Sequence, residues 1–461
     1  MVAPKITPAV KSAFIDMVGQ NRFLDQAEHL ICYAYDSFLK ESLPEAVIFP
    51  KTTNEVSRIM TLAAAHKIPV TARGAGTSVC GAPVPVHHGL VICFSKMDKI
   101  IEINTKDRYA IVQPGVVNAD LQAALAPFGF FYPPDPGSMA MATIGGNIAQ
   151  NAGGPRCLKY GVTLDYLLGI EAVMADGKVV TYGSRNVKDV TGYKMAALFC
   201  GSEGTLGLTT RAIVKVVPIP EAAATLTVTF SDLADTANAV ADIIGSGILP
   251  AAMELMDDIC IKAIEDAAHL GLDREAAGML LIEVDGSTAA CKAELDRVIE
   301  KLKANNAKAM DRAETPEERE KLWLARRSAY GSFAKLSPDI LSEDVTVPVS
   351  KIPEMTRRCK AIGEKYGLVA GVLAHAGDGN MHPMFNVDRK NEEEWNRAMK
   401  AFDEIFEAAV DLGGTLSGEH GVGLAKTQHL PLVMDQDSRE LMSTIKRAVD
   451  PHNILNPGKF A

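Results

Sequence analysis

The sequence predicts an α+β protein with more than one domain. At 461 residues the chain is too long for a single ordinary hydrophobic core, so two or three domains are expected. Residues 46–113 alternate short apolar strands with helices, whereas the chain after Glu221 alternates half-exposed strands with longer helices. The first pattern is typical of an α/β unit, and the second indicates helices packed on one face of an antiparallel sheet.

The elements of the first half are bounded by clear local signals. Thr52 and Glu55 have the spacing of a capping box, which predicts a helix ending near His66. A second helix is expected from Asn118 to about Phe128. An Ala-Asp-Gly turn between two apolar runs predicts a hairpin of residues 171–174 and 178–182. Other strands are expected at residues 46–49, 69–72, 90–94, 109–113 and 209–217.

Pro218 and Pro220 mark the expected boundary between the two halves. Beyond them, Ser231 is the expected N-cap of a helix that reaches about Ile244. Later strands are expected at residues 225–230, 279–284, 370–375 and 381–387, and later helices near 287–305, 316–335, 353–366 and 391–412. We therefore expect domains at residues 1–220 and 221–425, followed by a C-terminal segment at 426–461.

Composition excludes several classes of protein. A net charge of −10 without a Lys/Arg-rich stripe argues against nucleic acid as a partner. No apolar stretch is long enough to span a bilayer, and the N-terminus lacks the apolar run of a signal peptide. Eight cysteines without a Cys-x-x-Cys pair argue against iron–sulfur and structural zinc sites, and they are typical of reduced thiols. We expect a cytoplasmic protein, with peripheral membrane association left open.

Two glycine-rich segments near the C-terminus concentrate metal-ligating side chains. Residues 375–382 read His-Ala-Gly-Asp-Gly-Asn-Met-His, and residues 418–423 read Gly-Glu-His-Gly-Val-Gly. Two imidazoles and a carboxylate form a three-ligand set that leaves coordination positions open, as a catalytic divalent metal requires. Such a set suits zinc, iron or manganese. His420, beside Glu419, would then act as a base. The alternative is a pair of turns whose histidines only form hydrogen bonds.

The first half carries glycine-rich loops of its own. Residues 73–78, Arg-Gly-Ala-Gly-Thr-Ser, follow a predicted strand and can offer backbone N–H groups to a pyrophosphate. They depart from the G-x-G-x-x-G fingerprint and no ribose-binding acid follows, which disfavours a nicotinamide-binding Rossmann unit. Denser glycine regions follow at 133–161, 189–193 and 201–207. Small residues there permit the backbone to pack against a flat, extended ligand, the alternative being a structural turn.

Taken together, these ordered motifs resemble the FAD-linked D-2-hydroxyacid dehydrogenases of the vanillyl-alcohol oxidase/p-cresol methylhydroxylase superfamily. That family includes the flavin-carrying component of glycolate oxidase, FAD-dependent D-lactate dehydrogenases and D-2-hydroxyglutarate dehydrogenase. The resemblance covers about residues 40–461. It implies a two-subdomain α/β FAD-binding domain of the p-cresol methylhydroxylase type and an antiparallel-sheet α+β substrate domain. The C-terminal segment is expected to return to the FAD domain.

The resemblance also implies which residues bind FAD. The pyrophosphate is expected on the first glycine loop, composed of Arg73, Gly74, Ala75, Gly76, Thr77 and Ser78. Residues expected around the isoalloxazine ring and its linker are Pro134, Gly137, Ser138, Thr143, Gly145, Gly146, Asn147, Asn151, Gly153 and Gly154. Glu203 and Gly204 are expected near the adenine half, and Asn456 is expected to reach the flavin from the C-terminus. Relatives with covalent flavin have a His just after the first loop, where this chain has Ser-Val-Cys-Gly, so non-covalent FAD is expected.

For the reaction, the resemblance implies that His375, His382 and Glu419 bind the metal and that His420 is the general base. The ion would lower the pKa of the substrate's α-hydroxyl and orient its carboxylate. His420 would take the hydroxyl proton while the Cα hydride passes to flavin N5. Asn380 is expected to position the substrate, the alternative being a turn residue.

The resemblance further points to the substrate. Arg326 matches the family's substrate arginine, whose planar fork suits a carboxylate, the alternative being a solvated helix face. Tyr330 falls one turn further on the same face. Relatives that use dicarboxylates have a Lys two residues before an Asp of the next strand, and this chain, aligned on Asp344, has Ser342 there. We therefore expect oxidation of a small D-2-hydroxyacid, D-lactate or glycolate, to the 2-oxoacid.

The chain has no iron–sulfur or haem motif, so its electrons must pass to an external acceptor. An electron-transfer flavoprotein, an iron–sulfur subunit and a quinone all remain open, as does a homo-oligomer. Three other functions remain open as well. The chain could be a D-2-hydroxyglutarate dehydrogenase, a non-catalytic FAD subunit of a larger oxidase, or a metal hydrolase without flavin, against which the glycine regions argue.

Overall fold

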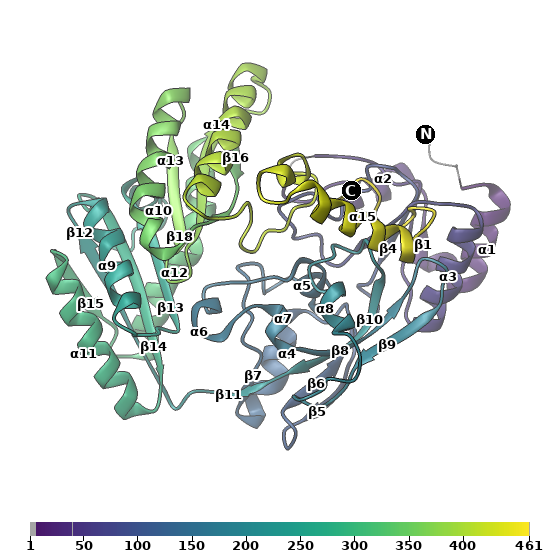
Figure 1. The fold of residues 1–461 in the computed structure, drawn as a ribbon, viewed down its shortest axis with the longest axis horizontal. Coiled ribbons are helices and arrows are strands. Elements are labelled where there is room, and N and C mark those ends of the chain that lie inside the picture. The colour runs from purple at the N-terminus through teal and green to yellow at the C-terminus, as the bar shows by residue number, and fades with distance from the viewer. Residues whose placement is uncertain (1–5, 39, 461) are drawn as a thin grey trace. The chain divides into compact units, whose positions relative to one another are not determined.

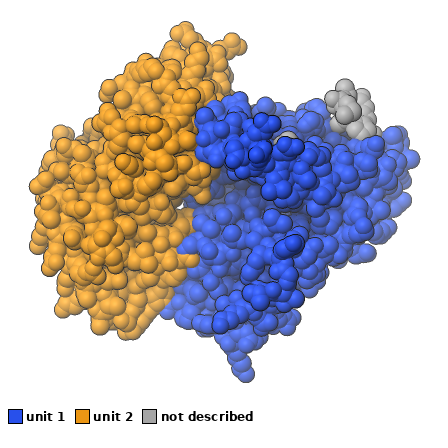
Figure 2. Space-filling model, in the orientation of Figure 1, with its two compact units in different colours: residues 1–153, 161–219, 419–461 blue, residues 154–160, 220–418 orange. Residues whose placement is uncertain are grey.

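The computed structural model describes residues 6–38 and 40–460 and divides into two compact units (Figures 1 and 2). Unit 1 comprises Met1–Gly153, Gly161–Ile219 and Glu419–Ala461, and unit 2 comprises Gly154–Tyr160 and Pro220–Gly418. The outermost residues of two predicted ranges, 1–5 and 461, lie outside the described residues. All eight cysteines are free thiols.

Unit 1 contains a four-stranded sheet in the order β1-β2-β4-β3. The strands are β1 (Phe23–Leu24), β2 (Ala46–Ile48), β4 (Leu90–Cys93) and β3 (Val70–Arg73), and only β1 runs antiparallel to its neighbour. Helices α1 (Pro8–Val18) and α3 (Thr53–Ala65) pack against this sheet. The Thr52 hydroxyl accepts the Glu55 amide at 3.1 Å, so the predicted N-cap of α3 is confirmed.

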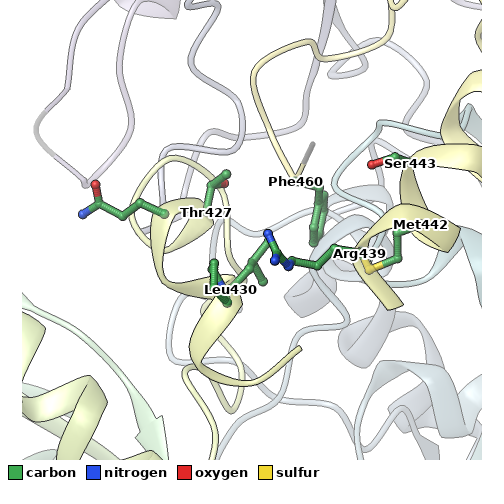
Figure 3. Close-up of a pocket in the computed structure, with 8 residues that line it drawn as sticks. Thr427, Leu430, Arg439, Met442, Ser443 and Phe460 are labelled. Atoms are coloured by element: carbon green, nitrogen blue, oxygen red, sulfur yellow. The ribbon is translucent and has the colours of Figure 1, made fainter. Parts of the chain in front are cut away.

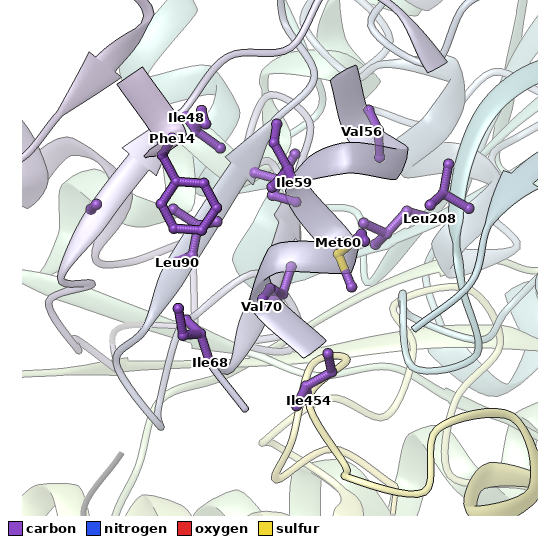
Figure 4. Packing of buried hydrophobic residues seen from close by; sticks show 14 of the residues in the cluster. Phe14, Ile48, Val56, Ile59, Met60, Ile68, Val70, Leu90, Leu208 and Ile454 are labelled. Carbon is purple, nitrogen blue, oxygen red and sulfur yellow. The ribbon is translucent and has the colours of Figure 1, made fainter. Parts of the chain in front are cut away.

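The core of unit 1 lies around α3 (Figure 4). Buried side chains on α3, among them Ile59 and Met60, recur at helical spacing and meet Phe14 of α1. Leu208, from a second sheet, belongs to the same cluster, and so does Ile454 near the C-terminus. Helix α3 therefore joins both sheets and the end of the chain in one hydrophobic core.

The second sheet of unit 1 is antiparallel, in the order β5-β6-β10-β8-β9. The predicted hairpin of residues 171–174 and 178–182 is confirmed as the β8–β9 pair. Strand β5 was not predicted, because Glu102 interrupts its isoleucines and no continuous apolar run marks it. The strands are β5 (Ile100–Asn104), β6 (Tyr109–Val112), β10 (Leu208–Lys215), β8 (Leu167–Val173) and β9 (Val179–Gly183), joined by α4 (Asn118–Leu125), α5 (Ile144–Gln150), α7 (Thr163–Tyr166) and α8 (Met195–Phe199).

The C-terminal segment packs within unit 1. The Val70 amide donates to the carbonyl of Ile454 at 2.7 Å, and the Asn456 amide donates to the carbonyl of Val70 at 2.7 Å. Leu455, between them, is fully buried. Helix α15 (Gln436–Val449) precedes this contact. Residues 454–456 thus lie beside Val70, the first residue of β3.

Unit 2 is built on an eight-stranded antiparallel sheet in the order β15-β12-β14-β13-β18-β19-β16, with β17 also paired to β19. The strands are β12 (Ala222–Phe230), β13 (Ala252–Asp257), β14 (Gly278–Gly286), β15 (Ala309–Arg312), β16 (Asp339–Ser342), β17 (Val345–Thr346), β18 (Ala370–His375) and β19 (Asn380–Val387). The helices are α9 (Leu233–Gly245), α10 (Asp258–Ala268), α11 (Thr288–Ala304), α12 (Pro316–Phe333), α13 (Ile352–Tyr366) and α14 (Glu392–Asp411).

Helices cover both faces of this sheet, so the expectation of a single helical layer is wrong. A Cβ on Gly371 of β18 would meet Phe333 of α12 at 2.6 Å. The adjacent Ala370 points to the opposite face, where its Cβ lies against Gly363 of α13. The physical reason is that β13 and β18 are buried at every residue, and a strand that is apolar on both sides must be covered on both sides.

Two further details of unit 2 differ from expectation. The N-cap of α9 is Asp232, whose carboxylate accepts the Ala234 amide at 2.7 Å, rather than Ser231. Strand β13 and helix α10, which Asp257 caps, were not predicted. In the described part of the chain, no helix is long and apolar enough to cross a membrane.

Candidate functional site

The first glycine loop follows β3 and is shaped by close backbone contacts. Arg73 is buried and donates to the carbonyl of Tyr35 at 2.8 Å. A Cβ on Gly74 would come within 2.3 Å of the Thr143 hydroxyl, and a Cβ on Gly76 would meet the Arg73 guanidinium. Gly76 also has a φ of +75°, which favours glycine. The loop thus lies against the start of α5, where Thr143 is the N-cap.

The features of this region fit a flat cofactor that carries a pyrophosphate. Gly145 lies so close to Pro114 that a Cβ would meet it at 2.5 Å, and Gly137 is exposed, with no atom near its Cβ position. Asn147 is buried, and its Nδ2 has no hydrogen-bond partner among the described residues. An unsatisfied buried donor beside a small-residue loop is the arrangement expected where a polar ligand completes the site.

Two residues expected at the FAD site, Glu203 near the adenine half and Asn456 near the flavin, also bind other parts of unit 1. The Glu203 carboxylate is buried and accepts the amides of Val422 and Gly423 at 2.7 and 2.9 Å. Burial raises the pKa of Glu203 to about 7, although those amides and Lys459 favour the carboxylate. Asn456 donates to the carbonyls of Glu203 and Ala82. These two hydrogen bonds hold the C-terminal segment against the loops of unit 1 that contain Ala82 and Glu203.

A pocket of about 270 Å³ lies within the C-terminal segment itself (Figure 3). In the close-up, Arg439 extends between Leu430 and Phe460. The other lining residues are Thr427, Gln428, Pro431, Met442 and Ser443, and they include none of the predicted site residues.

In unit 2, strand register brings the predicted polar residues to one face of the sheet. His375 of β18 pairs with Asn380 of β19, and His382 lies two residues beyond Asn380, so all three share a face. Glu254 of β13 pairs with His375 and therefore shares that face. The two histidine rings are nearly perpendicular, with centroids 5.0 Å apart.

Glu254 is the residue that ties this face together. It is fully buried, and its two oxygens accept the His375 Nδ1 hydrogen at 2.8 and 2.9 Å. One of them also accepts Nε of Arg326 on α12, at 2.6 Å. Burial opposes ionisation of Glu254, but the facing His375 and Arg326 hold its pKa below the usual range. The predicted carboxylate-binding arginine is thus held beside a predicted metal ligand. Tyr330, one turn beyond Arg326, is 42% exposed.

The second glycine-rich segment leaves unit 2 at Gly418, which is held firmly. The buried carboxylate of Asp344 accepts the Ser417 hydroxyl at 2.9 Å and the Gly418 amide at 2.6 Å. A Cβ on Gly418 would meet Asn380 at 2.6 Å, so a side chain there would displace Asn380. The chain position of Glu419 and His420 is therefore set by the residues immediately before them.

The ligand-type atoms form two small groups. Those of His375, His382 and Glu419 all lie within 4.8 Å of one another, and so do those of Glu343, Asp344 and His420. The first group contains the three ligands predicted from the sequence, and its His₂Glu donors suit zinc, iron or manganese. Glu254, Glu343 and Asp344 were not among the predicted site residues. The available signal for Glu254 was an acid in the middle of an apolar run.

The last of the predicted flavin glycines, Gly154, begins a short stretch that belongs to unit 2, whereas Asn151 and Gly153 belong to unit 1. Tyr160 donates to Asp285 at 2.7 Å, and Lys159 pairs with the same carboxylate. Asp285 lies on β14, on the face that carries Glu254, so residues 154–160 cover part of the candidate site's face.

Known families and proteins match this chain over nearly its whole length. The FAD binding domain matches residues 44–183, and the C-terminal domain of FAD linked oxidases matches residues 219–460. Glycolate oxidase subunit GlcD of Bacillus subtilis is 44% identical, over 99% of this chain and 97% of that protein. The Escherichia coli subunit of the same name is 37% identical, over 98% of this chain and 90% of that protein. A D-lactate dehydrogenase of Archaeoglobus fulgidus is 35% identical, over 90% of each.

Solved structures confirm the predicted fold class. A substrate-bound p-cresol methylhydroxylase superposes with a TM-score of 0.81 at 20% identity, over 98% of this chain and 96% of that one. A 4-ethylphenol oxidase from Gulosibacter chungangensis has a TM-score of 0.80 at 18% identity, over 100% of this chain and 99% of that one. The family resemblance drawn from the glycine and histidine motifs is also confirmed, because this chain belongs to the FAD-linked oxidases, as an oxidoreductase of the glycolate oxidase GlcD and D-lactate dehydrogenase type.

Proposed function

We propose that this flavoprotein oxidises a small D-2-hydroxyacid, D-lactate or glycolate, to the 2-oxoacid with the help of a divalent metal ion. The observation that carries the proposal is the His375, His382 and Glu419 group, which offers one ligand atom from each residue within 4.8 Å of the others. It is supported by relatives named as glycolate oxidase subunits and a D-lactate dehydrogenase.

The residues divide the work of the reaction among them. The first glycine loop and α5 would hold FAD, and His375, His382 and Glu419 would hold the metal ion. When bound, FAD supplies the hydride acceptor and the ion supplies a positive charge that acidifies the substrate hydroxyl. His420 takes the hydroxyl proton as the α-carbon loses its hydride, so the C–O single bond becomes a carbonyl. Arg326 binds the substrate carboxylate through the donors that Glu254 does not use.

The expected substrate is small and has one carboxylate. Ser342 ends β16 where relatives that use dicarboxylates have a Lys. A second carboxylate buried without a cation is costly, so D-2-hydroxyglutarate is expected to react less efficiently than D-lactate. The D-enantiomer is expected because the arginine, the ion and the base together fix three substituents of the α-carbon.

Anaerobic mixing of the FAD-loaded protein with candidate substrates tests the proposal. Bleaching of the flavin absorbance by D-lactate or glycolate is expected, with L-lactate and D-2-hydroxyglutarate at least tenfold less efficient. A clear preference for D-2-hydroxyglutarate would overturn the substrate assignment. Unbleached flavin with every hydroxyacid would instead favour a non-catalytic FAD subunit.

The electron acceptor is proposed to be another protein. The two GlcD relatives are named as subunits, which supports a partner subunit as the next electron carrier. Reduced flavin that is reoxidised by a partner subunit, but only slowly by a soluble quinone, would support this assignment. Fast reoxidation by quinone alone would contradict it.

A further inference from the structure

Glu254 lies in the middle of β13, is fully buried, and contacts two residues to which the proposed function gives different tasks. It accepts hydrogen bonds from His375 and from Arg326. We propose that Glu254 is a positioning residue that fixes the metal-binding nitrogen of His375 and, at the same time, the carboxylate-binding edge of Arg326. This inference rests on the proposed function and adds to it a residue that touches neither metal nor substrate.

A purely structural role does not explain why this buried position carries a carboxylate. Every residue of β13 is buried, and a well-packed apolar side chain is often as stabilising as a buried ion pair. Glu254 satisfies two donors from distant parts of the chain, 121 and 72 residues away in sequence. Both donors belong to predicted functional side chains, so the acid serves their geometry rather than the core alone.

Glu254 determines which nitrogen of His375 faces an ion. An ionised carboxylate can only accept, so the hydrogen of the neutral ring must lie on Nδ1. The ring would therefore coordinate a metal through Nε2. A carboxylate behind a metal-binding imidazole fixes the ring's tautomer and orientation and makes the ring a stronger ligand, and loss of such a partner typically lowers metal affinity 10- to 100-fold.

The same carboxylate determines how Arg326 is presented. Its Nε–H points to Glu254 at 2.6 Å, and the side chain is only 13% exposed. The remaining donors lie on the two terminal nitrogens, whose paired geometry suits a carboxylate. One acid thus holds the substrate arginine at a fixed place relative to the metal-binding histidine.

Glu283 provides a matched control on the same sheet. It lies on β14, on the same face as Glu254, and is 1% exposed. It also binds α12, through Trp323 at 2.8 Å and Arg319 at 3.1 Å, but it contacts no histidine. Neutralising Glu283 therefore removes a buried charge of the same kind without touching the proposed metal ligand.

The test measures zinc affinity of the FAD-loaded, full-length protein by competition with a chromophoric chelator. In Glu254→Gln the negative charge is lost and one acceptor oxygen becomes an amide donor, so the side chain no longer fixes the Nδ1–H tautomer and the orientation of the His375 ring. We expect zinc affinity to fall 10- to 100-fold and the KM for D-lactate to rise at saturating zinc. Glu283→Gln is expected to keep zinc affinity within twofold of the unmodified protein.

Three outcomes would overturn the inference. Unchanged zinc affinity in folded Glu254→Gln would show that Glu254 does not position His375. Equal losses of zinc affinity in Glu254→Gln and Glu283→Gln would show that Glu254 only stabilises the fold. Absence of zinc binding by the unmodified protein would overturn both this inference and the proposed metal site. If Glu254→Gln does not fold, Glu254→Asp replaces it. That variant keeps the charge but falls one methylene short of His375, so a loss of about tenfold is expected and unchanged affinity would refute the role.

Discussion

An alanine at position 74 tests whether the first glycine loop binds FAD. Its Cβ would lie 2.3 Å from the Thr143 hydroxyl oxygen. That oxygen accepts the Gly146 amide at 3.2 Å and so caps α5. Thr143 can withdraw the oxygen only by rotating its side chain and losing the cap, and otherwise the loop itself must move.

The expected magnitude follows from those two responses. Loss of an N-cap costs about 1 kcal/mol, and overpacking of a tight site costs about 1–3 kcal/mol. If the FAD pyrophosphate binds the loop in its present position, the displaced loop of the variant must return to that position when FAD binds. This energy then weakens FAD binding. Because about 1.4 kcal/mol corresponds to a tenfold change, Gly74→Ala should weaken FAD binding roughly 5- to 150-fold.

The assay is titration of apo-protein with FAD, followed by flavin fluorescence. Gly245→Ala is the matched control, because nothing lies within 4 Å of its Cβ position and Gly245 belongs to α9, outside the predicted FAD site, so its affinity should stay within twofold. Adding Thr143→Ala to Gly74→Ala removes the 2.3 Å contact and leaves one of 3.5 Å, so the double variant should lose less than the sum of the single losses. Tight FAD binding by Gly74→Ala, equal to that of the unmodified protein, would refute the assignment of this loop.

Three further predictions concern the other predicted roles. His382→Ala should lose bound metal and turnover while it retains FAD, and full metal occupancy in that variant would contradict the ligand set. His420→Ala should reduce its flavin with substrate about 10² to 10⁴ times more slowly at normal metal and FAD content, and a near-normal rate would place the base elsewhere. Glu203 has a pKa of about 7 in the fold against 4.5 for an ordinary Glu, so the folded apo-protein binds this proton more tightly than the unfolded chain does. Its contribution to the free energy of unfolding is therefore complete below about pH 4.5 and is lost, by about 3 kcal/mol, as the pH rises through 7. Glu203→Gln should flatten that part of the urea-unfolding profile, and identical profiles for both proteins would contradict the shift.

Local sequence signals predicted the elements that carry the site. Strands β18 and β19 are apolar runs on the two sides of one glycine-rich turn, and each carries one of the two histidines. The N-cap of α3 has its own spacing signal. Fold class and family followed because several glycine motifs occur in a fixed order along the chain. Each of these motifs is itself a local signal, which depends only on neighbouring residues.

Strand β13 could not be predicted in the same way. Its central Glu254 interrupts an apolar run, and an isolated acid in such a run normally argues against a buried strand. The acid is tolerated only because His375 and Arg326 satisfy it, and both lie far away in sequence. The second helical layer was missed for a related reason, since burial of a strand on both faces depends on how distant helices pack.

The register of unit 2 links its core to its candidate site. Glu254 meets His375 only because β13 and β18 pair in one register, and a slip of one residue would turn Glu254 to the face covered by α13. Gly371 lies four residues before His375 on β18 and so shares the site's face, where it lies against Phe333. Ala370 lies against α13 on the other face. These apolar contacts resist a slip of β18, because a Cβ at position 371 would already meet the Phe333 ring at 2.6 Å. Packing beneath the site therefore maintains the pairing on which the histidine, the arginine and their shared carboxylate depend.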